Sequence, residues 1–320
     1  MDAFVVDIST IIVSYNTAGL LNECMEKLRS ASQNQMVEEV FVDNASKDAS
    51  VDVIRRDFPH SRLIVNPTNI GFGRANNQAL ALASGRYVLL LNTDAFVAPD
   101  TLAKTLAYMD AHPKCGILGV RLEGRDGVLQ PCCRYFPTPW NTFLQRSGLN
   151  RLFKDVQMVD DMEWSHDTVR SCDWVVGCYY LVRKAVIDQV GLFDPRYFLY
   201  FEEVDHCFAA KKAGWDVVFY PHTTVVHLGG ESAKSDGSIT ASGRQLEALQ
   251  IESELLYFRK NHGLGAVWSS VMLTVLANSI NLFKRAMKRG VALDAVGAWR
   301  HSVLVCTTFA RTRWATQPTR

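Results

Sequence analysis

Short apolar segments alternate with amphipathic ones over the first third of this 320-residue chain. The apolar segments are rich in valine, isoleucine and leucine and lie at residues 8–14, 40–42, 63–65 and 87–91. Each is followed by polar residues and then by a stretch with helical spacing. Strands that alternate with helices in this way form a mainly parallel sheet with helices on both faces. The sequence therefore predicts an α/β fold with a Rossmann-like central sheet.

Polar residues follow each predicted strand, at the edge of the sheet where folds of this class bind ligands. They are Ser14, Tyr15 and Asn16 after the first strand, Asp43 after the second, Asn69, Gly71 and Arg74 after the third, and Asn92, Thr93 and Asp94 after the fourth. Because the carboxyl ends of parallel strands share one edge, we expect a single binding site there.

Asp43 and the glycine-containing segment after the third strand favour a nucleotide ligand. A carboxylate at Asp43 can accept the imide N–H of uracil or thymine, and the alternative is a helix cap or a local turn. Gly71 and Gly73 precede a predicted helix, whose N-terminus together with Arg74 suits a diphosphate. The alternative is an ordinary glycine turn. The third glycine of the dinucleotide fingerprint is missing, which disfavours an NAD-dependent oxidoreductase.

Asp94 and His227 are candidate metal ligands. Asp94 follows a fully apolar predicted strand. His227 lies near the end of an apolar segment at residues 224–228, which we expect to be a strand separate from another predicted at residues 216–219. An oxygen ligand in this position suits Mg²⁺ or Mn²⁺, which keep several waters and bridge substrate phosphates. The alternative is that His227 is a structural residue at the end of a strand.

Adjacent carboxylates at Glu202 and Glu203 follow an aromatic segment at residues 197–201, which we expect to be a strand, and begin a predicted helix. One of them could take a proton from an acceptor hydroxyl, although acids in a first turn also stabilise the helix dipole. Trp174 and Gly177 could shape an apolar acceptor pocket that suits a sugar ring, and the alternative for Trp174 is a place in the core.

Read in order, these motifs resemble glycosyltransferase family 2, and within it the bacterial rhamnosyltransferases that build lipopolysaccharide O-antigen and related surface glycans. The resemblance spans residues 8–260. The segments that carry it are residues 12–16, 42–46, 69–77, 90–94, 173–177, 191–195, 198–205, 226–227 and 252–260.

The resemblance implies a GT-A fold and an inverting, metal-dependent hexosyl transfer from a nucleotide-diphosphate sugar. Asp43 would read the pyrimidine, and Arg74 would approach the diphosphate. Asp94 and His227 would hold Mg²⁺ or Mn²⁺. Glu203 would be the catalytic base, with Glu202 as the alternative. The other polar residues that follow the four strands would also bind the donor.

Two departures from the family pattern bear on these roles. The usual Asp-x-Asp is Asn92-Thr93-Asp94 here, so the metal has one carboxylate fewer, and the usual Glu-Asp pair is Glu202-Glu203. The resemblance favours dTDP-rhamnose as donor and a polyprenyl-diphosphate-linked glycan as acceptor. The alternatives are a UDP-sugar donor carrying N-acetylglucosamine, galactose or galactofuranose, and a catalytically inactive GT-A scaffold.

The charge of the chain is unevenly distributed. The net charge is +1, yet residues 284–320 hold eight basic residues and one acidic residue, so the rest of the chain is acidic. The apolar segment 264–283, which contains several polar residues, precedes this basic end. We expect a helix that lies on an anionic membrane surface rather than one that spans it, and the alternative is a packed core helix.

We expect a catalytic domain over residues 1–243, with a nucleotide-binding half at 1–120 and an acceptor half at 121–243, and a basic helical extension at 244–320. Residues 121–173 lack a clear period and are predicted to be a long loop region. The N-terminus does not resemble a signal peptide, and the eight cysteines lack a repeated spacing. These features predict a cytoplasmic protein with reduced, mostly buried thiols, peripheral at the inner face of the plasma membrane. The acidic body disfavours nucleic-acid binding.

Overall fold

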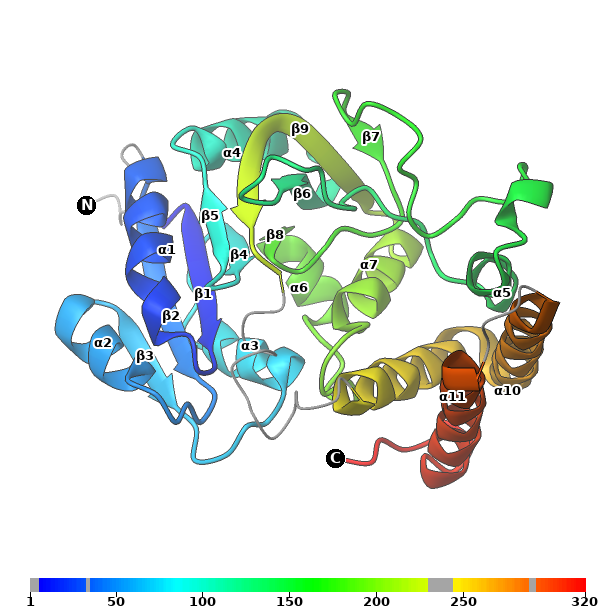
Figure 1. Cartoon of the computed structure of the whole chain (residues 1–320). Coiled ribbons are helices and arrows are strands. Elements are labelled where there is room, and N and C mark those ends of the chain that lie inside the picture. The colour runs from blue at the N-terminus through cyan, green and yellow to red at the C-terminus, as the bar shows by residue number, and fades with distance from the viewer. Residues whose placement is uncertain (1–5, 33–34, 230–243, 288–291) are drawn as a thin grey trace. The chain divides into compact units, whose positions relative to one another are not determined.

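A computed structural model describes residues 6–32, 35–229, 244–287 and 292–320 (Figure 1). The chain forms two compact units. The first unit comprises Met1–Arg134, Met162–Pro195 and Glu202–Ser242, and the second comprises Tyr135–Asp161, Arg196–Phe201 and Gly243–Arg320. The expected domain boundary after residue 243 falls at the edge of a segment outside the described residues.

The first unit is built around one nine-stranded sheet. Its strands are β1 (Ile8–Ser14), β2 (Val37–Asp43), β3 (Arg62–Val65), β4 (Tyr87–Leu91), β5 (Ala95–Val97), β6 (Cys115–Glu123), β7 (Arg170–Ser171), β8 (Tyr179–Arg183) and β9 (Asp216–His227). Their order is β3-β2-β1-β4-β8-β6-β9-β5, with β7 beside β9. The four predicted strands β1 to β4 run parallel, whereas β8 is antiparallel to both β4 and β6, so the sheet as a whole is mixed.

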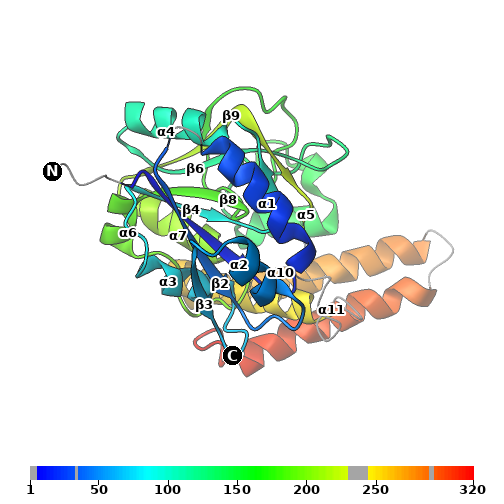
Figure 2. The same ribbon diagram turned by 90° about the vertical axis from the view of Figure 1, so that its left-hand side faces the viewer.

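Helices flank this sheet (Figures 1 and 2). They are α1 (Ala18–Ala31), α2 (Ser50–Asp57), α3 (Phe72–Leu80), α4 (Thr101–Ala111), α6 (Lys184–Val190) and α7 (Glu202–Lys212). In α1 the buried residues recur every three or four positions, which places them on one face of the helix: Leu21, Cys24, Met25, Leu28 and Ala31. All five residues of β4 are buried, as expected for a central strand covered on both faces. Seven of the eight cysteines are buried, as predicted.

The aromatic segment 197–201 is not a strand, and that prediction is wrong. Tyr200 and Phe201 both have positive φ, at 71° and 68°, which an extended strand does not allow. Contacts within the second unit hold this backbone, since Ser253 donates to the Leu199 carbonyl at 2.9 Å and the rings of Phe201 and Tyr257 lie 5.5 Å apart. Two consecutive bulky residues in this region cost about 1–3 kcal/mol each.

Two further predictions are corrected by the structure. The separate strands expected near residues 216–219 and 224–228 form the single strand β9, with a register shift against β6. The region 121–173 is not one loop. It contains the end of β6, the helix α5 (Pro139–Ser147), the 3₁₀ turn η1 (Asn150–Leu152) and β7.

The second unit contains α5, η1, α10 (Arg244–Met287) and α11 (Ala292–Arg311). Gly263 interrupts α10 with φ 83°. By length and composition, the segment Gln245–Lys284 could cross a membrane, and 28% of its most apolar window is buried. One such helix is weak evidence for a span, because helices of soluble proteins can pass the same test.

Candidate active site

The polar ends of the first strands lie along one edge of the sheet, as predicted. Ser14 pairs with Asp43 at the ends of β1 and β2, and the next backbone N–H, from Asn44, donates to the Ser14 carbonyl at 2.8 Å. The Asn66 N–H donates to the Asp43 carbonyl at 2.9 Å and brings the loop after β3 to the same place. Asn16 also lies here, because its N–H donates to Ser46 Oγ at 2.9 Å.

The two oxygens of Asp43 have different environments, although the side chain as a whole is only 1% exposed. Oδ2 accepts the backbone N–H of Ser46 at 2.9 Å, which is the local turn considered from the sequence. Oδ1 is buried and has no hydrogen-bond partner among the described residues. Leaving a buried acceptor unsatisfied costs about 1–3 kcal/mol, so this oxygen is suited to an incoming N–H donor.

Asn44 organises the glycine-containing loop that precedes α3. Its Nδ2 donates to Asn69 Oδ1 at 2.8 Å, and its Oδ1 accepts the Ile70 N–H at 3.1 Å. Gly71 caps α3 with φ 91°, a conformation that favours glycine. Arg74 Nε donates to the Pro195 carbonyl at 2.7 Å, so this guanidinium also holds the loop after α6. Its contact with a diphosphate stays a prediction.

Asp94 and His227 lie side by side because β5 and β9 are antiparallel neighbours, with Ala95 opposite His227. His227 Nε2 is 3.6 Å from Asp94 Oδ1, and both side chains are largely buried. Burial lowers the pKa of His227, and the charge of Asp94 opposes this effect. A neutral imidazole beside a carboxylate is a donor set that fits Mg²⁺ or Mn²⁺.

Within the described ranges, no group of three or more His, Cys, Asp and Glu side chains is arranged to hold a metal ion. Asp94 and His227 would thus provide two protein ligands, and substrate phosphates and water would complete the coordination. That sharing is usual for Mg²⁺, which takes one or two carboxylates plus substrate phosphates. Thr93, the residue before Asp94, is buried. The N–H of Asn92 donates to the Cys178 carbonyl at 3.0 Å.

The structure separates the environments of the two adjacent carboxylates at the start of α7. The Cβ of Glu202 packs near Gly73 of α3, where an added Cβ would lie 3.6 Å away. Glu203 instead lies near Gly177, at which an added Cβ would be 3.9 Å from Glu203 Oε1. Oε2 of Glu203 is buried and has no hydrogen-bond partner among the described residues. Glu203 therefore has a free acceptor oxygen beside the segment that precedes β8.

Burial raises the pKa of Glu203. Two effects oppose this shift without cancelling it. One is hydrogen bonding from the backbone N–H groups of Glu203 itself, Gly177 and Val204, and the other is the positive charge of Arg134. A carboxylate held in this way is a stronger proton acceptor than an ordinary glutamate.

Arg134 is a residue near the site that the sequence did not single out. Its guanidinium lies 4.2 Å from the centroid of the Trp174 ring, and the two residues form an antiparallel bridge. Trp174 is 6% exposed, so the core place considered from the sequence is the one observed, and its contact with an acceptor stays a prediction. Gln130, which contacts His227, is a second such residue.

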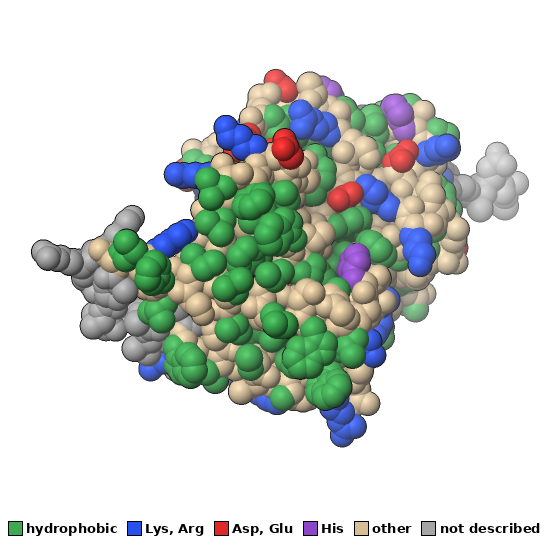
Figure 3. Space-filling view, turned by 90° about the vertical axis from the view of Figure 1, so that its right-hand side faces the viewer, with side chains coloured by type: hydrophobic (Ala, Val, Ile, Leu, Met, Phe, Trp, Pro, Cys, Tyr) green, Lys and Arg blue, Asp and Glu red, His purple; other side chains and the backbone are tan. Residues whose placement is uncertain are grey.

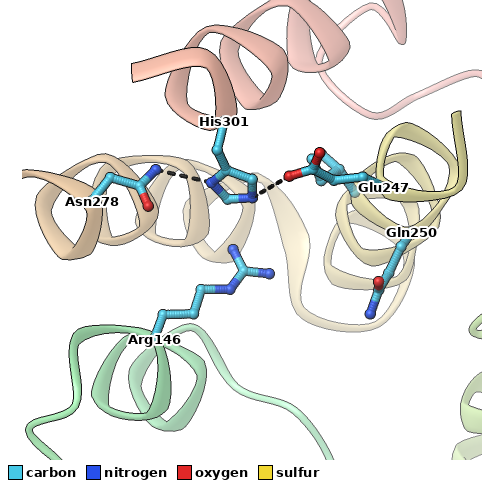
Figure 4. Close-up of a pocket in the computed structure, with 6 residues that line it drawn as sticks. Arg146, Glu247, Gln250, Asn278 and His301 are labelled. Atoms are coloured by element: carbon cyan, nitrogen blue, oxygen red, sulfur yellow. Dashed lines mark hydrogen bonds and ion pairs between the residues drawn. The ribbon is translucent and has the colours of Figure 1, made fainter. Parts of the chain in front are cut away.

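A cavity of about 430 Å³ lies within the second unit (Figure 4). It is lined by Arg146, Glu247, Gln250, Ile251, Asn278 and His301. Its one permanent cation, Arg146, already pairs with Glu254 at 2.9 Å. His301 Nε2 lies 3.7 Å from Glu247 Oε1, and burial lowers the pKa of His301, which favours a neutral imidazole. The Glu247 carboxylate therefore makes this cavity a poor match for a doubly charged diphosphate.

Residues 9–159 match the family model described as Glycosyl transferase family 2. The N-acetylglucosaminyl-diphospho-decaprenol L-rhamnosyltransferase of Mycobacterium tuberculosis is 26% identical over 296 residues, which cover 87% of this chain and 92% of that protein. The low-salt glycan biosynthesis hexosyltransferase Agl10 of Haloferax volcanii is 22% identical over 64% of this chain and 62% of its own length.

Solved structures share the fold. The mannosyltransferase PcManGT from Pyrobaculum calidifontis, in complex with GDP-Man and Mn²⁺, aligns with a TM-score of 0.56 and 15% identity over 98% of this chain and 89% of that one. GalNAc-T7 with UDP, GalNAc and Mn²⁺ aligns with a TM-score of 0.57 and 13% identity over 99% of this chain and 59% of that one. The central sheet flanked by helices, with helices at the C-terminus, is the predicted GT-A architecture.

Proposed function

Because the chain is a glycosyltransferase of family 2 that resembles bacterial rhamnosyltransferases, we propose that it transfers L-rhamnose from dTDP-rhamnose to a polyprenyl-diphosphate-linked glycan, with inversion. The observation that carries this proposal is the pairing of Asp94 with a neutral His227 at 3.6 Å, at the edge of the sheet where β4 and β9 end. The rhamnosyltransferase relative, whose name includes a diphospho-decaprenol acceptor, supports the choice of sugar and acceptor.

In the proposed reaction, Asp43 Oδ1 accepts the imide N–H of the base, and the N-terminus of α3 faces the diphosphate. When bound, a divalent cation held by Asp94 and His227 would neutralise charge on the leaving diphosphate. Glu203 takes the proton of the acceptor hydroxyl as that oxygen attacks the anomeric carbon from the opposite side. A single displacement of this kind inverts the anomeric configuration, and it relies on positioning and fixed charges.

A panel of nucleotide sugars, assayed with Mn²⁺, Mg²⁺ or EDTA and a polyprenyl-diphosphate N-acetylglucosamine acceptor, tests this function. We expect transfer of rhamnose from dTDP-rhamnose with either metal and loss of transfer in EDTA. Turnover of a UDP-sugar instead would support the alternative donor, because uracil and thymine present the same imide edge to Asp43. If no donor is turned over with either metal, the hypothesis that the chain is an active transferase is wrong. That result would support the alternative of a catalytically inactive scaffold.

We further propose that the second unit binds the anionic membrane surface that carries such an acceptor. Exposed apolar side chains recur along one face of α10, with spacings of four and seven: Trp268, Met272, Leu276, Phe283 and Met287. On α11, which packs against α10, Trp299 and Val303 are also exposed. Figure 3 shows hydrophobic side chains gathered on one face of the molecule, with lysine and arginine at its margin.

Basic residues complement this apolar stripe. Lys284, Arg300, Arg311 and Arg313 are exposed. Each basic residue near an anionic bilayer contributes about 1 kcal/mol to binding, and burial of an apolar side chain contributes roughly 1.5–3 kcal/mol. Apolar side chains on one face and basic residues nearby are the pattern of a helix that lies in the interface.

The double substitution Met272→Ser and Trp299→Ser should lower binding to phosphatidylglycerol vesicles at least ten-fold in a co-sedimentation assay. The control is Val128→Ser, which removes a side chain that is 62% exposed in the first unit and should leave binding unchanged. Binding should also weaken as salt is added. If the wild-type protein does not bind these vesicles and is dimeric by light scattering, the membrane proposal is wrong. The exposed apolar side chains would then contact a second copy of the chain.

A further inference from the structure

One side chain, Gln130, makes two hydrogen bonds to His227. Gln130 Nε2 donates to the His227 carbonyl at 2.7 Å, and Gln130 Oε1 lies 2.9 Å from His227 Nδ1. Both bonds lie within the first unit. The ring contact is at Nδ1, whereas Asp94 lies 3.6 Å from the other ring nitrogen, Nε2. His227 is therefore held through its backbone and its ring by the same amide.

The chemistry of these two contacts fixes the proton on the imidazole. A backbone carbonyl only accepts hydrogen bonds, so the group of Gln130 that faces it must be the NH₂. The amide oxygen must then face Nδ1, and because this oxygen cannot donate, Nδ1 must carry the hydrogen. In a neutral imidazole, the other nitrogen, Nε2, is left with its lone pair exposed.

This tautomer differs from the one that Asp94 alone would favour. The Asp94 carboxylate is 3.6 Å from Nε2 and would attract a hydrogen placed on that nitrogen. Gln130 opposes that arrangement, so the lone pair of Nε2 and the carboxylate face the same point. Two acceptors directed at one point are what a divalent cation requires.

The backbone around Gln130 is well anchored. Its N–H donates to the Leu122 carbonyl at 2.9 Å, and the tight turn between β6 and Gln130 includes Gly127 with φ 74°. Leu122 in turn pairs with Val225 of β9. The hairpin is thus tied to the strand that ends in His227, and the amide has little freedom to move away from the imidazole.

We propose that Gln130 is a positioning residue for His227, which it holds in the Nδ1–H tautomer so that Nε2 and Asp94 together receive a divalent cation. This inference rests on the proposed function in so far as Asp94 and His227 bind the metal. Partners that orient a metal-bound histidine in this way typically contribute 10- to 100-fold to metal affinity.

Two variants of similar length separate the hydrogen bond from packing. Gln130→Met fills the same space without a donor or acceptor. Gln130→Glu keeps an acceptor for the Nδ1 hydrogen and loses only the donor to the His227 carbonyl. Nitrogen-15 NMR of the imidazoles reports the tautomer without metal, with His227→Ala identifying the resonance. Titration with Mn²⁺ alone, followed by EPR of the free ion, reports affinity.

We expect His227 to carry its hydrogen on Nδ1 in the wild type and in Gln130→Glu, and to shift toward the Nε2–H form in Gln130→Met. Mn²⁺ affinity should fall 10- to 100-fold in Gln130→Met and should change only a few-fold in Gln130→Glu. An unchanged tautomer and unchanged Mn²⁺ affinity in Gln130→Met would overturn the proposal. A third outcome separates this proposal from the proposed function. If Gln130→Met shifts the tautomer but the wild type binds Mn²⁺ no better than Asp94→Asn, then Asp94 and His227 are not the metal ligands. Gln130 would still be the residue that sets the tautomer of His227.

Discussion

Glu203→Gln should lower the rate of sugar transfer by about 10²–10⁴-fold and leave the affinity for the nucleotide-sugar donor unchanged. The amide keeps the shape of the side chain but cannot take a proton from the acceptor hydroxyl. Single-turnover transfer measures the first effect, and donor binding by calorimetry measures the second. The matched control is Glu202→Gln, which changes the neighbouring carboxylate, whose Cβ packs near α3.

The raised pKa of Glu203 gives this experiment an internal check on folding. A carboxyl group whose folded-state pKa exceeds its unfolded value binds its proton more tightly in the native state, so stability falls as pH rises from the ordinary value near 4.5 toward the raised one. Glutamine removes this loss, and Glu203→Gln should be at least as stable as the wild type at neutral pH. Lost transfer with a lowered Tm would point to misfolding rather than to a missing base.

The same shift sets the pH dependence of the wild-type rate. Glu203 must be ionised to act as a base, so transfer should increase with pH along a limb that lies above the ordinary glutamate pKa of 4.5. Two outcomes would identify Glu202 as the base instead. One is near-normal transfer by Glu203→Gln. The other is an acid limb of the pH profile that persists in Glu203→Gln and disappears in Glu202→Gln.

Asp94→Asn should lower transfer on the order of 10²–10³-fold, the loss seen when one fixed charge-stabilising group is removed from a catalytic site. The amide keeps the size of the side chain but removes the only negative charge in the Asp94–His227 pair. The variant should also need more Mn²⁺ for half-maximal rate. Measuring the rate against Mn²⁺ concentration separates this effect from a loss of donor binding.

The control for Asp94→Asn is Asp188→Asn. Asp188 is an exposed acid of the same unit that pairs with Lys184 along α6, and such surface pairs contribute little to stability. Its loss should leave both the rate and the Mn²⁺ dependence unchanged. Equal rates for Asp94→Asn and the wild type across the Mn²⁺ series would exclude Asp94 from the reaction.

The first half of the fold was predictable because its signals are local. Each parallel strand is a continuous apolar run that ends in polar residues, and these polar ends do lie together, as the pairing of Ser14 with Asp43 shows. The aromatic segment 197–201 carried the same kind of apolar signal but is not a strand. Its conformation depends on contacts with Ser253 and Tyr257, which are far away in sequence.

Gln130 and Arg134 were missed for a related reason. Both lie in a region without hydrophobic periodicity, so their positions relative to the sheet could not be predicted. Gln130 matters because it meets His227, which is 97 positions later, and Arg134 because it stacks on Trp174. A long-range contact between a polar side chain and a single histidine leaves no trace in the spacing of one sequence.

The left-handed backbone at Tyr200 and Phe201 has an evolutionary consequence. These residues lead directly into the first turn of α7, which carries Glu202 and Glu203, and glycine would adopt the same angles without the steric penalty. Glycine would also remove the ring of Phe201 that packs against Tyr257. Selection at position 201 therefore balances the strain of the backbone against the packing of the aromatic ring.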